Sequence, residues 1–132
     1  MPVIDTVVLF AAADSKDPRH EKAYIYLEKL SENNYIISCL ALLEFDIVLK
    51  SRGLPPEDRM EKLALLMADY PQIKEKTGRI TPLTLYLLAK LEMEYNLDYF
   101  DAGVAAEALQ HDGIIISTDR AFDKVPNIER KW

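Results

Sequence analysis

The chain has 132 residues, of which 49% are hydrophobic and 29% charged, as in an ordinary globular domain, and we take residues 1–132 as one domain. Its apolar runs are too short to cross a bilayer, no signal-peptide pattern opens it, and its single cysteine, Cys39, cannot form an intramolecular disulfide. These features predict a cytoplasmic protein with no membrane contact. The formal net charge of −6 argues against a broad basic surface for nucleic acid, because Lys and Arg dominate phosphate binding.

The first half of the sequence alternates short apolar runs with segments that carry helix-start signals. In chain order it predicts a strand at Val3–Ile4, an apolar helix at Thr6–Ala13, a helix over 17–33, a strand at Tyr35–Ser38, and helices over 40–53 and 55–70. Asp17 is the expected N-cap of the second helix, with Pro18 at its first position. Gly53 is the expected end of the third helix.

The second half continues the alternation. In chain order it predicts a short strand near Arg79–Ile80, a helix capped by Thr81, a helix that ends at Gly113, a strand at Ile114–Ser117, a short helix or turn over 120–124, and a last strand near Ile128–Lys131. Because helices separate the strands, we expect parallel pairing with crossover helices. The expected architecture is a three-layer α/β/α fold around a short, mostly parallel central sheet.

Four acidic residues occupy positions where a carboxylate is unusual. Asp5 and Asp119 follow predicted strands, at the sheet edge where α/β folds bind ligands. Glu44 and Asp101 lie on the apolar faces of their helices, where an unpaired carboxylate is costly. Each also has a structural interpretation: Asp5 and Asp119 as helix caps, Asp101 with Asp98 in a capping box, and Glu44 paired with a buried Lys or Arg. One shared site would accommodate all four.

Such a cluster of acids calls for cations. Two unit charges about 4 Å apart repel by about 4 kcal/mol at an effective dielectric constant of about 20, so four carboxylates in one pocket do not all stay ionised unaided. Oxygen donors without a His or Cys cluster select Mg²⁺ or Mn²⁺ rather than zinc. Thr6 and Thr118, beside Asp5 and Asp119, are then expected to orient the carboxylates by hydrogen bonds.

Four segments together resemble the PIN domain, in particular the small VapC-like toxin type. They are "VIDTVVLFAAA", "IISCLALLEFDIVL", "LDYFDAGVAAEAL" and "IIISTDRAFDKV", and in this order they span essentially the whole chain. The resemblance implies that the acidic quartet of the family falls on Asp5, Glu44, Asp101 and Asp119, and that Thr118 matches its Ser/Thr. It also implies a metal-dependent ribonuclease acting on RNA, a homodimer, and a partner antitoxin that holds the enzyme inactive.

Several alternatives remain open at this stage. Asp98 lies one helical turn before Asp101 and is a second candidate ligand from that helix. Arg120, Lys50 and Arg52 are candidate phosphate contacts or plain surface residues. A receiver-like phospho-acceptor domain also places acids at strand ends, but it requires paired acids after the first strand and a lysine at a late strand end. A catalytically silent PIN-fold binding module is the remaining class.

Overall fold

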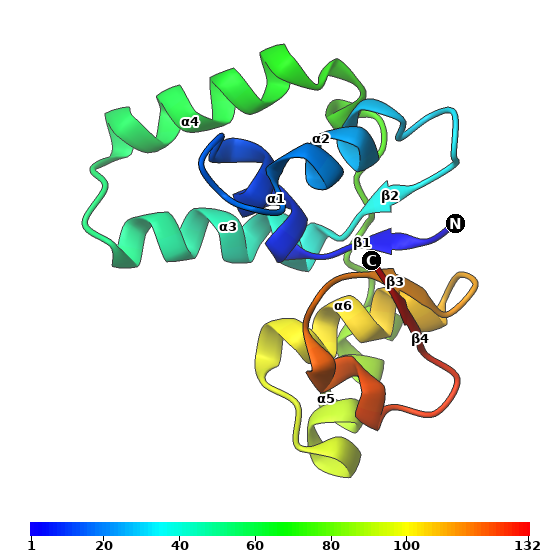
Figure 1. The fold of residues 1–132 in the computed structure, drawn as a ribbon. Helices are drawn as coiled ribbons and strands as arrows, with labels where there is room; N and C mark the ends of the chain where they lie inside the picture. Colours follow the sequence, from blue (N-terminus) through cyan, green and yellow to red (C-terminus); the bar gives the residue numbers. More distant parts are fainter.

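The central sheet has four parallel strands. The computed structural model describes residues 1–132. The strands are β1 (Val3–Ile4), β2 (Ile36–Ile37), β3 (Ile114–Ile116) and β4 (Glu129–Lys131), in the order β2-β1-β3-β4. Every neighbouring pair is parallel (Figure 1), so the carboxyl ends of all four strands lie at one edge of the sheet. The expected parallel sheet is confirmed.

Six helices cover the two faces of this sheet. They are α1 (Thr6–Ala13), α2 (His20–Glu28), α3 (Cys39–Ser51), α4 (Pro56–Asp69), α5 (Pro82–Tyr95) and α6 (Tyr99–Leu109), with 3-10 turns η1 (Pro71–Lys74) and η2 (Arg120–Lys124). Helices α1 to α4 lie on one side of the strands, and α5 and α6 on the other (Figure 1). The three-layer α/β/α architecture is therefore confirmed. None of these helices is both long enough and apolar enough to span a membrane.

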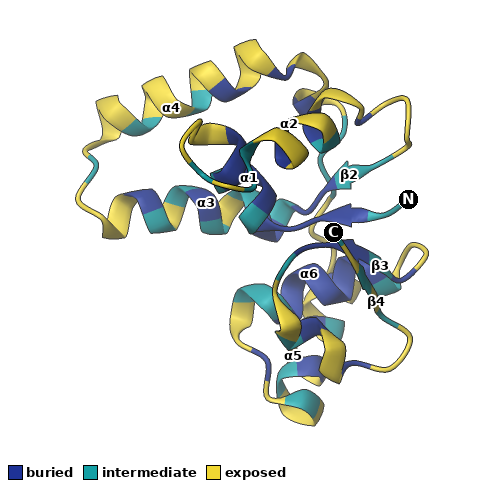
Figure 2. Ribbon diagram, viewed as in Figure 1, coloured by how far each residue is buried: buried dark blue, intermediate teal, exposed yellow.

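The sheet separates two hydrophobic cores. Ile4, Ile37 and Ile116 pack with α1, α2, α3 and α4 in one core. Val3 and Ile115 belong to the other core, with α5 and α6. Successive residues of a strand point to opposite faces, so each short apolar run supplies both cores. Figure 2 shows β1, much of β3 and α6 as the buried centre, with α4 and β4 largely exposed.

Polar side chains fix the starts of three helices beside the sheet. The Ser38 hydroxyl accepts a hydrogen bond from the Ala41 N–H at the start of α3, and Asp98 accepts one from the Asp101 N–H at the start of α6. Thr81 forms a capping box with Thr84 at the start of α5, which confirms the predicted cap. These caps satisfy backbone donors that the first helical turn leaves free.

Two local predictions are wrong. Asp17 does not cap α2, which begins at His20; the Asp17 carboxylate instead accepts hydrogen bonds from Arg19. No strand forms at Arg79–Ile80. The chain touches β2 only once, through a parallel bridge between Thr77 and Ile37, and then continues exposed into the Thr81 cap. At Asp17, the contact with the Arg19 side chain takes the carboxylate that a helix cap would have used.

Candidate active site

A cavity of about 530 Å³ opens where the carboxyl ends of β1 and β3 meet α1, α3 and the start of α6. Its acidic lining residues are Asp5, Glu44, Asp98, Asp101 and Asp119. The other lining residues are Thr6, Val7, Phe10, Arg19, Val48, Arg52 and Thr118. Acids from four separate parts of the sequence thus face one space, together with both threonines singled out from the sequence. We call this space the acidic cavity.

Asp5 is the most buried acid of the cavity, with 4% of its surface exposed. It occupies the N-cap position of α1, yet its side chain makes no capping hydrogen bond. Its Oδ2 instead accepts a hydrogen bond of 2.7 Å from the Ser117 hydroxyl. Burial raises the pKa of Asp5 to about 6, against the lowering effect of the Ser117 hydrogen bond, and the charges of Glu44 and Asp119 add to the rise. The capping interpretation of this side chain is not realised.

Glu44 lies half-buried on α3 and faces the cavity. Its Oε1 accepts a hydrogen bond of 2.6 Å from the Thr6 hydroxyl, so Thr6 orients this carboxylate. Burial is the main cause of its raised pKa, and the charges of Asp98 and Asp119 add to it. Asp46, two residues on, forms an ion pair with Arg59 at 3.6 Å. Glu44 has no such partner, so the predicted buried pairing with Lys or Arg is absent.

Asp98 and Asp101 have different roles at the start of α6. The exposed Asp98 is the N-cap, and its Oδ1 accepts the Asp101 N–H at 2.8 Å. The half-buried Asp101 carboxylate lines the cavity, and no protein donor is bonded to it. Burial raises the pKa of Asp101 to about 8, with further contributions from the charges of Asp98, Asp119, Asp5 and Glu44. Only one half of the expected capping box is present, and it leaves the Asp101 carboxylate free to face the cavity.

Ser117 is the hydroxyl that the sequence analysis missed. Its oxygen donates to Asp5 and accepts a hydrogen bond of 3.0 Å from the Asp119 N–H. Val3 is in register with Ile115, so two residues further on Asp5 meets Ser117. Thr118, the hydroxyl chosen from the sequence, accepts a hydrogen bond from Arg19 Nη1 at 3.4 Å instead. Asp119 caps η2 by accepting the Ala121 N–H at 2.9 Å, and it still lines the cavity.

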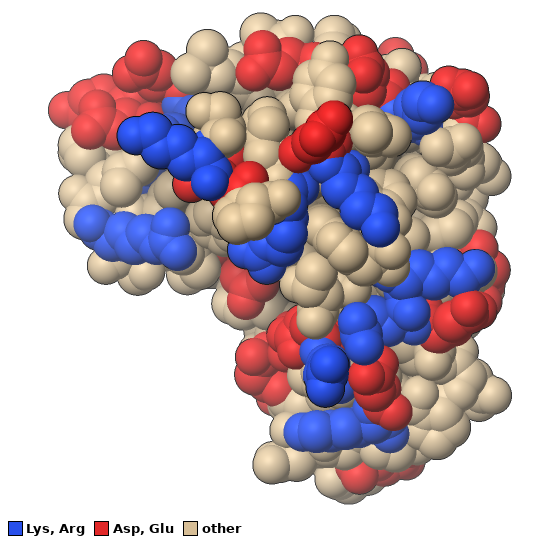
Figure 3. Space-filling view, viewed as in Figure 1, with Lys and Arg blue, Asp and Glu red and all other residues tan.

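Two arginines and no lysine line the acidic cavity. Arg52 lies over the Phe10 ring, with its guanidinium carbon 5.0 Å from the ring centroid. Arg19, which the sequence analysis did not single out, is paired with Asp17. Lys50 and Arg120 are not among the lining residues. Figure 3 shows acidic side chains bordering the notch in the outline of the molecule, with basic side chains close by on the same face.

The donor set fits a hard divalent cation. None of the five cavity acids forms an ion pair with Lys or Arg within 4.0 Å. The available metal ligands are carboxylate oxygens, and no His or Cys lines the cavity. This combination suits Mg²⁺ or Mn²⁺. No three acidic side chains are arranged here as they would be around one bound ion. The carboxylates therefore share a space, without converging on a single point.

A second buried carboxylate lies outside this cavity. Glu107, 4% exposed, accepts hydrogen bonds from the Ser38 hydroxyl and, at 3.0 Å, from the Cys39 N–H. It lines a separate cavity of about 330 Å³ beside β2, together with Ile36, Thr77, Gly78 and other residues. Because its oxygens satisfy the N-terminus of α3, Glu107 has a structural role in this arrangement.

The comparisons with known proteins agree with this fold. The family model for the PIN domain matches residues 3–128. A comparison of the sequence with curated proteins found no significant match.

Three solved structures share this fold, and one of them is bound to DNA. One is VapBC2 from Rickettsia felis bound to a DNA fragment from their promoter, with a TM-score of 0.72 and 18% identity over 98% of this chain and 96% of that chain. Another is FitAcB from Neisseria gonorrhoeae, with a TM-score of 0.71 and 16% identity over the same shares of the two chains. A Pyrobaculum aerophilum structure has a TM-score of 0.61 and 19% identity, over 97% of this chain and 88% of that chain. Identities this low establish a shared fold.

Proposed function

This chain belongs to the PIN domain family, and from that premise we propose that it is a Mg²⁺- or Mn²⁺-dependent ribonuclease whose active site is the acidic cavity. PIN domains are generally nucleases, that is, hydrolases acting on nucleic acids. The choice of RNA as substrate follows from the resemblance to VapC-like toxins. The proposal depends on one observation above all: five carboxylates face a single cavity, and none of them forms an ion pair with Lys or Arg.

In this proposal the ligands of the ion come from among Asp5, Glu44, Asp101 and Asp119, which line the same cavity. A bound Mg²⁺ or Mn²⁺ would lower the pKa of a coordinated water and neutralise charge that grows on the phosphate. The protein orients the ligands by hydrogen bonds. The Ser117 hydroxyl donates to Asp5, and the hydroxyl of Thr6, the first residue of α1, donates to Glu44. The net reaction is hydrolysis, in which a water oxygen bonds to phosphorus and the ester oxygen leaves.

We assign the partners by analogy with the fold neighbours. The matched chain in VapBC2 and the matched chain in FitAcB each align over nearly their whole length with this chain, and VapBC2 was crystallised with promoter DNA. We propose that this chain is likewise the toxin of a toxin–antitoxin pair and acts as a homodimer when free. Size-exclusion chromatography of the chain alone, and of the chain co-purified with a small partner from its native source, would test both assignments.

Cleavage assays test the nuclease proposal directly. Mixed RNA should be cleaved in the presence of Mn²⁺, and cleavage should stop with EDTA and in Asp5→Asn. The matched control is Asp46→Asn, which changes an acid on the opposite side of α3 that pairs with Arg59; it should retain activity. Full activity in Asp5→Asn would overturn the proposal.

The two other classes make different predictions. A receiver-like domain needs a lysine near its acids, and no lysine lines the acidic cavity. Incorporation of phosphate from a small phosphodonor would nevertheless favour that class. A silent binding module would show no metal-dependent cleavage with or without its partner.

A further inference from the structure

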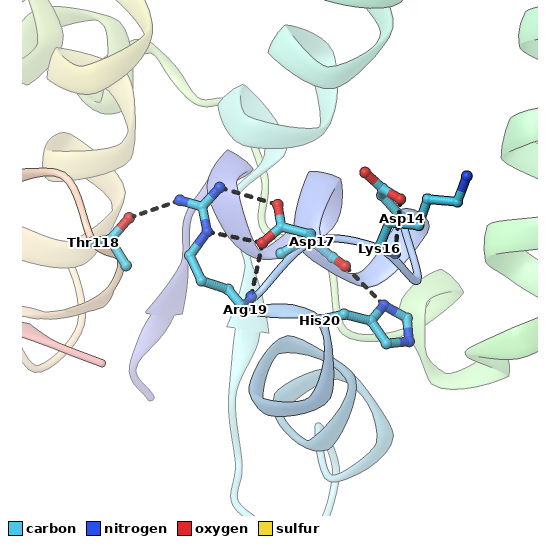
Figure 4. A network of polar contacts seen from close by, with 7 residues as sticks. Asp14, Lys16, Asp17, Arg19, His20 and Thr118 are labelled. Carbon is cyan, nitrogen blue, oxygen red and sulfur yellow. Dashed lines mark hydrogen bonds and ion pairs between the residues drawn. The ribbon is translucent and has the colours of Figure 1, made fainter.

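Arg19 reaches the acidic cavity from the turn before α2. Figure 4 shows its guanidinium lying between Asp17 on one side and Thr118 on the other. Asp17 Oδ1 accepts from Arg19 Nε at 3.1 Å and from the Arg19 backbone N–H at 2.8 Å, and Asp17 Oδ2 accepts from Nη2 at 3.1 Å. The Asp17 side chain is 14% exposed and that of Arg19 is 42% exposed. One carboxylate therefore fixes both the backbone and the side chain of Arg19.

The turn that carries Arg19 is itself fastened to the rest of the protein. The His20 imidazole Nδ1 lies 2.9 Å from the Ala11 carbonyl oxygen at the end of α1. The Lys16 N–H donates to Asp14 at 3.0 Å (Figure 4). Because α1 begins at the cavity, these contacts tie the position of Arg19 to the same helix that carries Thr6.

The pairing with Asp17 leaves one edge of the guanidinium available. A guanidinium carries its N–H donors in a planar fork. Asp17 takes Nε and one N–H of Nη2, so Nη1 and the outer N–H of Nη2 remain. The only acceptor for Nη1 is the Thr118 hydroxyl, at a long 3.4 Å. This free edge matches the two-oxygen face of a phosphate.

We propose that Arg19 binds a backbone phosphate of the nucleic-acid substrate at the rim of the acidic cavity, and that Asp17 is the positioning residue that orients it. This inference rests on the proposed function, because it assigns a substrate contact to the same site. A cavity lined by five acids repels a polyanion, so a fixed donor pair beside the acids supplies the attraction that brings a phosphate to them.

The Asp17→Asn substitution distinguishes a positioning role of Asp17 from a simple effect of net charge. If only net charge matters, Asp17→Asn removes a negative charge beside the cavity and RNA binds more tightly. If Asp17 orients Arg19, the same substitution weakens binding, because the guanidinium loses its paired acceptor. Arg19→Lys keeps the charge and loses the fork, so it should also weaken binding. Arg120→Gln is the matched control, since Arg120 neighbours Asp119 in sequence and does not line the cavity.

The experiment measures binding of a fluorescent single-stranded RNA oligonucleotide to the full-length Asp5→Asn protein over a range of salt concentrations. Adding Arg19→Gln should weaken binding about tenfold and reduce the slope of log K against log salt by about 0.7, the value for one lost phosphate contact on a single strand. Asp17→Asn and Arg19→Lys should weaken binding several-fold, and Arg120→Gln should leave it unchanged. Unchanged thermal melting would show that the variants are folded.

Three outcomes would overturn the inference: no RNA binding by the parent protein, unaltered binding in Arg19→Gln, or tighter binding in Asp17→Asn. The failure of the nuclease proposal looks different. In that case neither the unsubstituted protein nor its variants cleave RNA with Mn²⁺, but the substitutions at Arg19 and Asp17 still weaken RNA binding. Conversely, if Arg19→Gln cleaves RNA as efficiently as the unsubstituted protein in the presence of metal, the role of Arg19 is contradicted and the nuclease proposal stands.

Discussion

At the scale of single residues, the site depends on hydroxyls that hold carboxylates in place. Ser117 donates to the nearly buried Asp5 and accepts the Asp119 N–H, so one oxygen connects two proposed ligands. The Thr6 hydroxyl donates a hydrogen bond to Glu44. Such outer contacts set the orientation of metal ligands and their affinity.

Replacing Ser117 should therefore weaken the proposed metal site. In Ser117→Ala, Asp5 loses the hydrogen bond that lowers its pKa, and we expect Mn²⁺ affinity and kcat/KM to fall by about 10-fold to 100-fold. Calorimetric titration with Mn²⁺ and RNA-cleavage kinetics measure the two quantities. Thr118→Val is the comparison, because that hydroxyl contacts Arg19 rather than a carboxylate. Equal losses in the two variants would contradict this role for Ser117.

The titration of Asp5 and Asp101 gives a prediction about pH. Their pKa values in the folded chain, about 6 and about 8, lie above the ordinary value of 3.8. The folded state therefore binds more protons than the unfolded state, so the metal-free protein loses stability as the pH rises from about 4 to about 8. Mg²⁺ should then raise the Tm more at about pH 8 than at about pH 5, because protons compete for the same oxygens.

Circular-dichroism melting with and without Mg²⁺ checks this pH dependence. Asp101→Asn removes the group with the higher pKa, so its metal-free Tm should fall less across the upper part of the range. A Mg²⁺ stabilisation that is larger at the acidic end would contradict the account.

At the scale of elements, the start of α6 gives different roles to Asp101, the predicted ligand, and Asp98, the second candidate from the sequence. Asp98→Ala should lower the free energy of unfolding by about 1 kcal/mol, because it removes the N-cap, whereas Asp98→Asn keeps a capping oxygen and should cost little. Asp101→Asn should instead abolish RNA cleavage and leave the helix cap intact. Urea unfolding and cleavage assays on the three variants distinguish the roles. A loss of activity in Asp98→Asn as severe as that in Asp101→Asn would make Asp98 a ligand.

The contact between α3 and α6 brings Glu44 and Asp101 to the same cavity. Gly103 lies against Leu40, and a Cβ at position 103 would collide with the Leu40 Cγ. We expect Gly103→Ala to lower the free energy of unfolding by about 1–3 kcal/mol through overpacking. The double variant with Leu40→Ala should lose less than the sum of the two single changes. Strict additivity in urea unfolding would show that the two positions are not coupled.

Helical periodicity was the most informative sequence signal for these elements. It placed Glu44 and Asp101 on inward faces, because the 3.6-residue period is a local property. Local signals failed where a nearby side chain takes the group on which the signal depends. Asp17 carries a good capping side chain, yet its carboxylate binds Arg19, and α2 starts at His20.

At the scale of the whole molecule, the parallel sheet explains why acids remote in sequence meet. Strands β1 and β3 end at the same edge of the sheet, so Asp5 and Asp119 reach one cavity. The alternation of strands and helices was sufficient to predict this. Two of the contacts at the site were not predictable, because the Asp5–Ser117 contact depends on the strand register and the Arg19–Thr118 contact on the path of a turn.

The most direct test of the central claim is anomalous scattering from a crystal of the protein soaked in Mn²⁺. The account predicts manganese in the acidic cavity, with ligands among Asp5, Glu44, Asp101 and Asp119. A cavity without manganese at saturating concentration, or manganese bound only at surface acids such as Asp14 and Asp112, would contradict it.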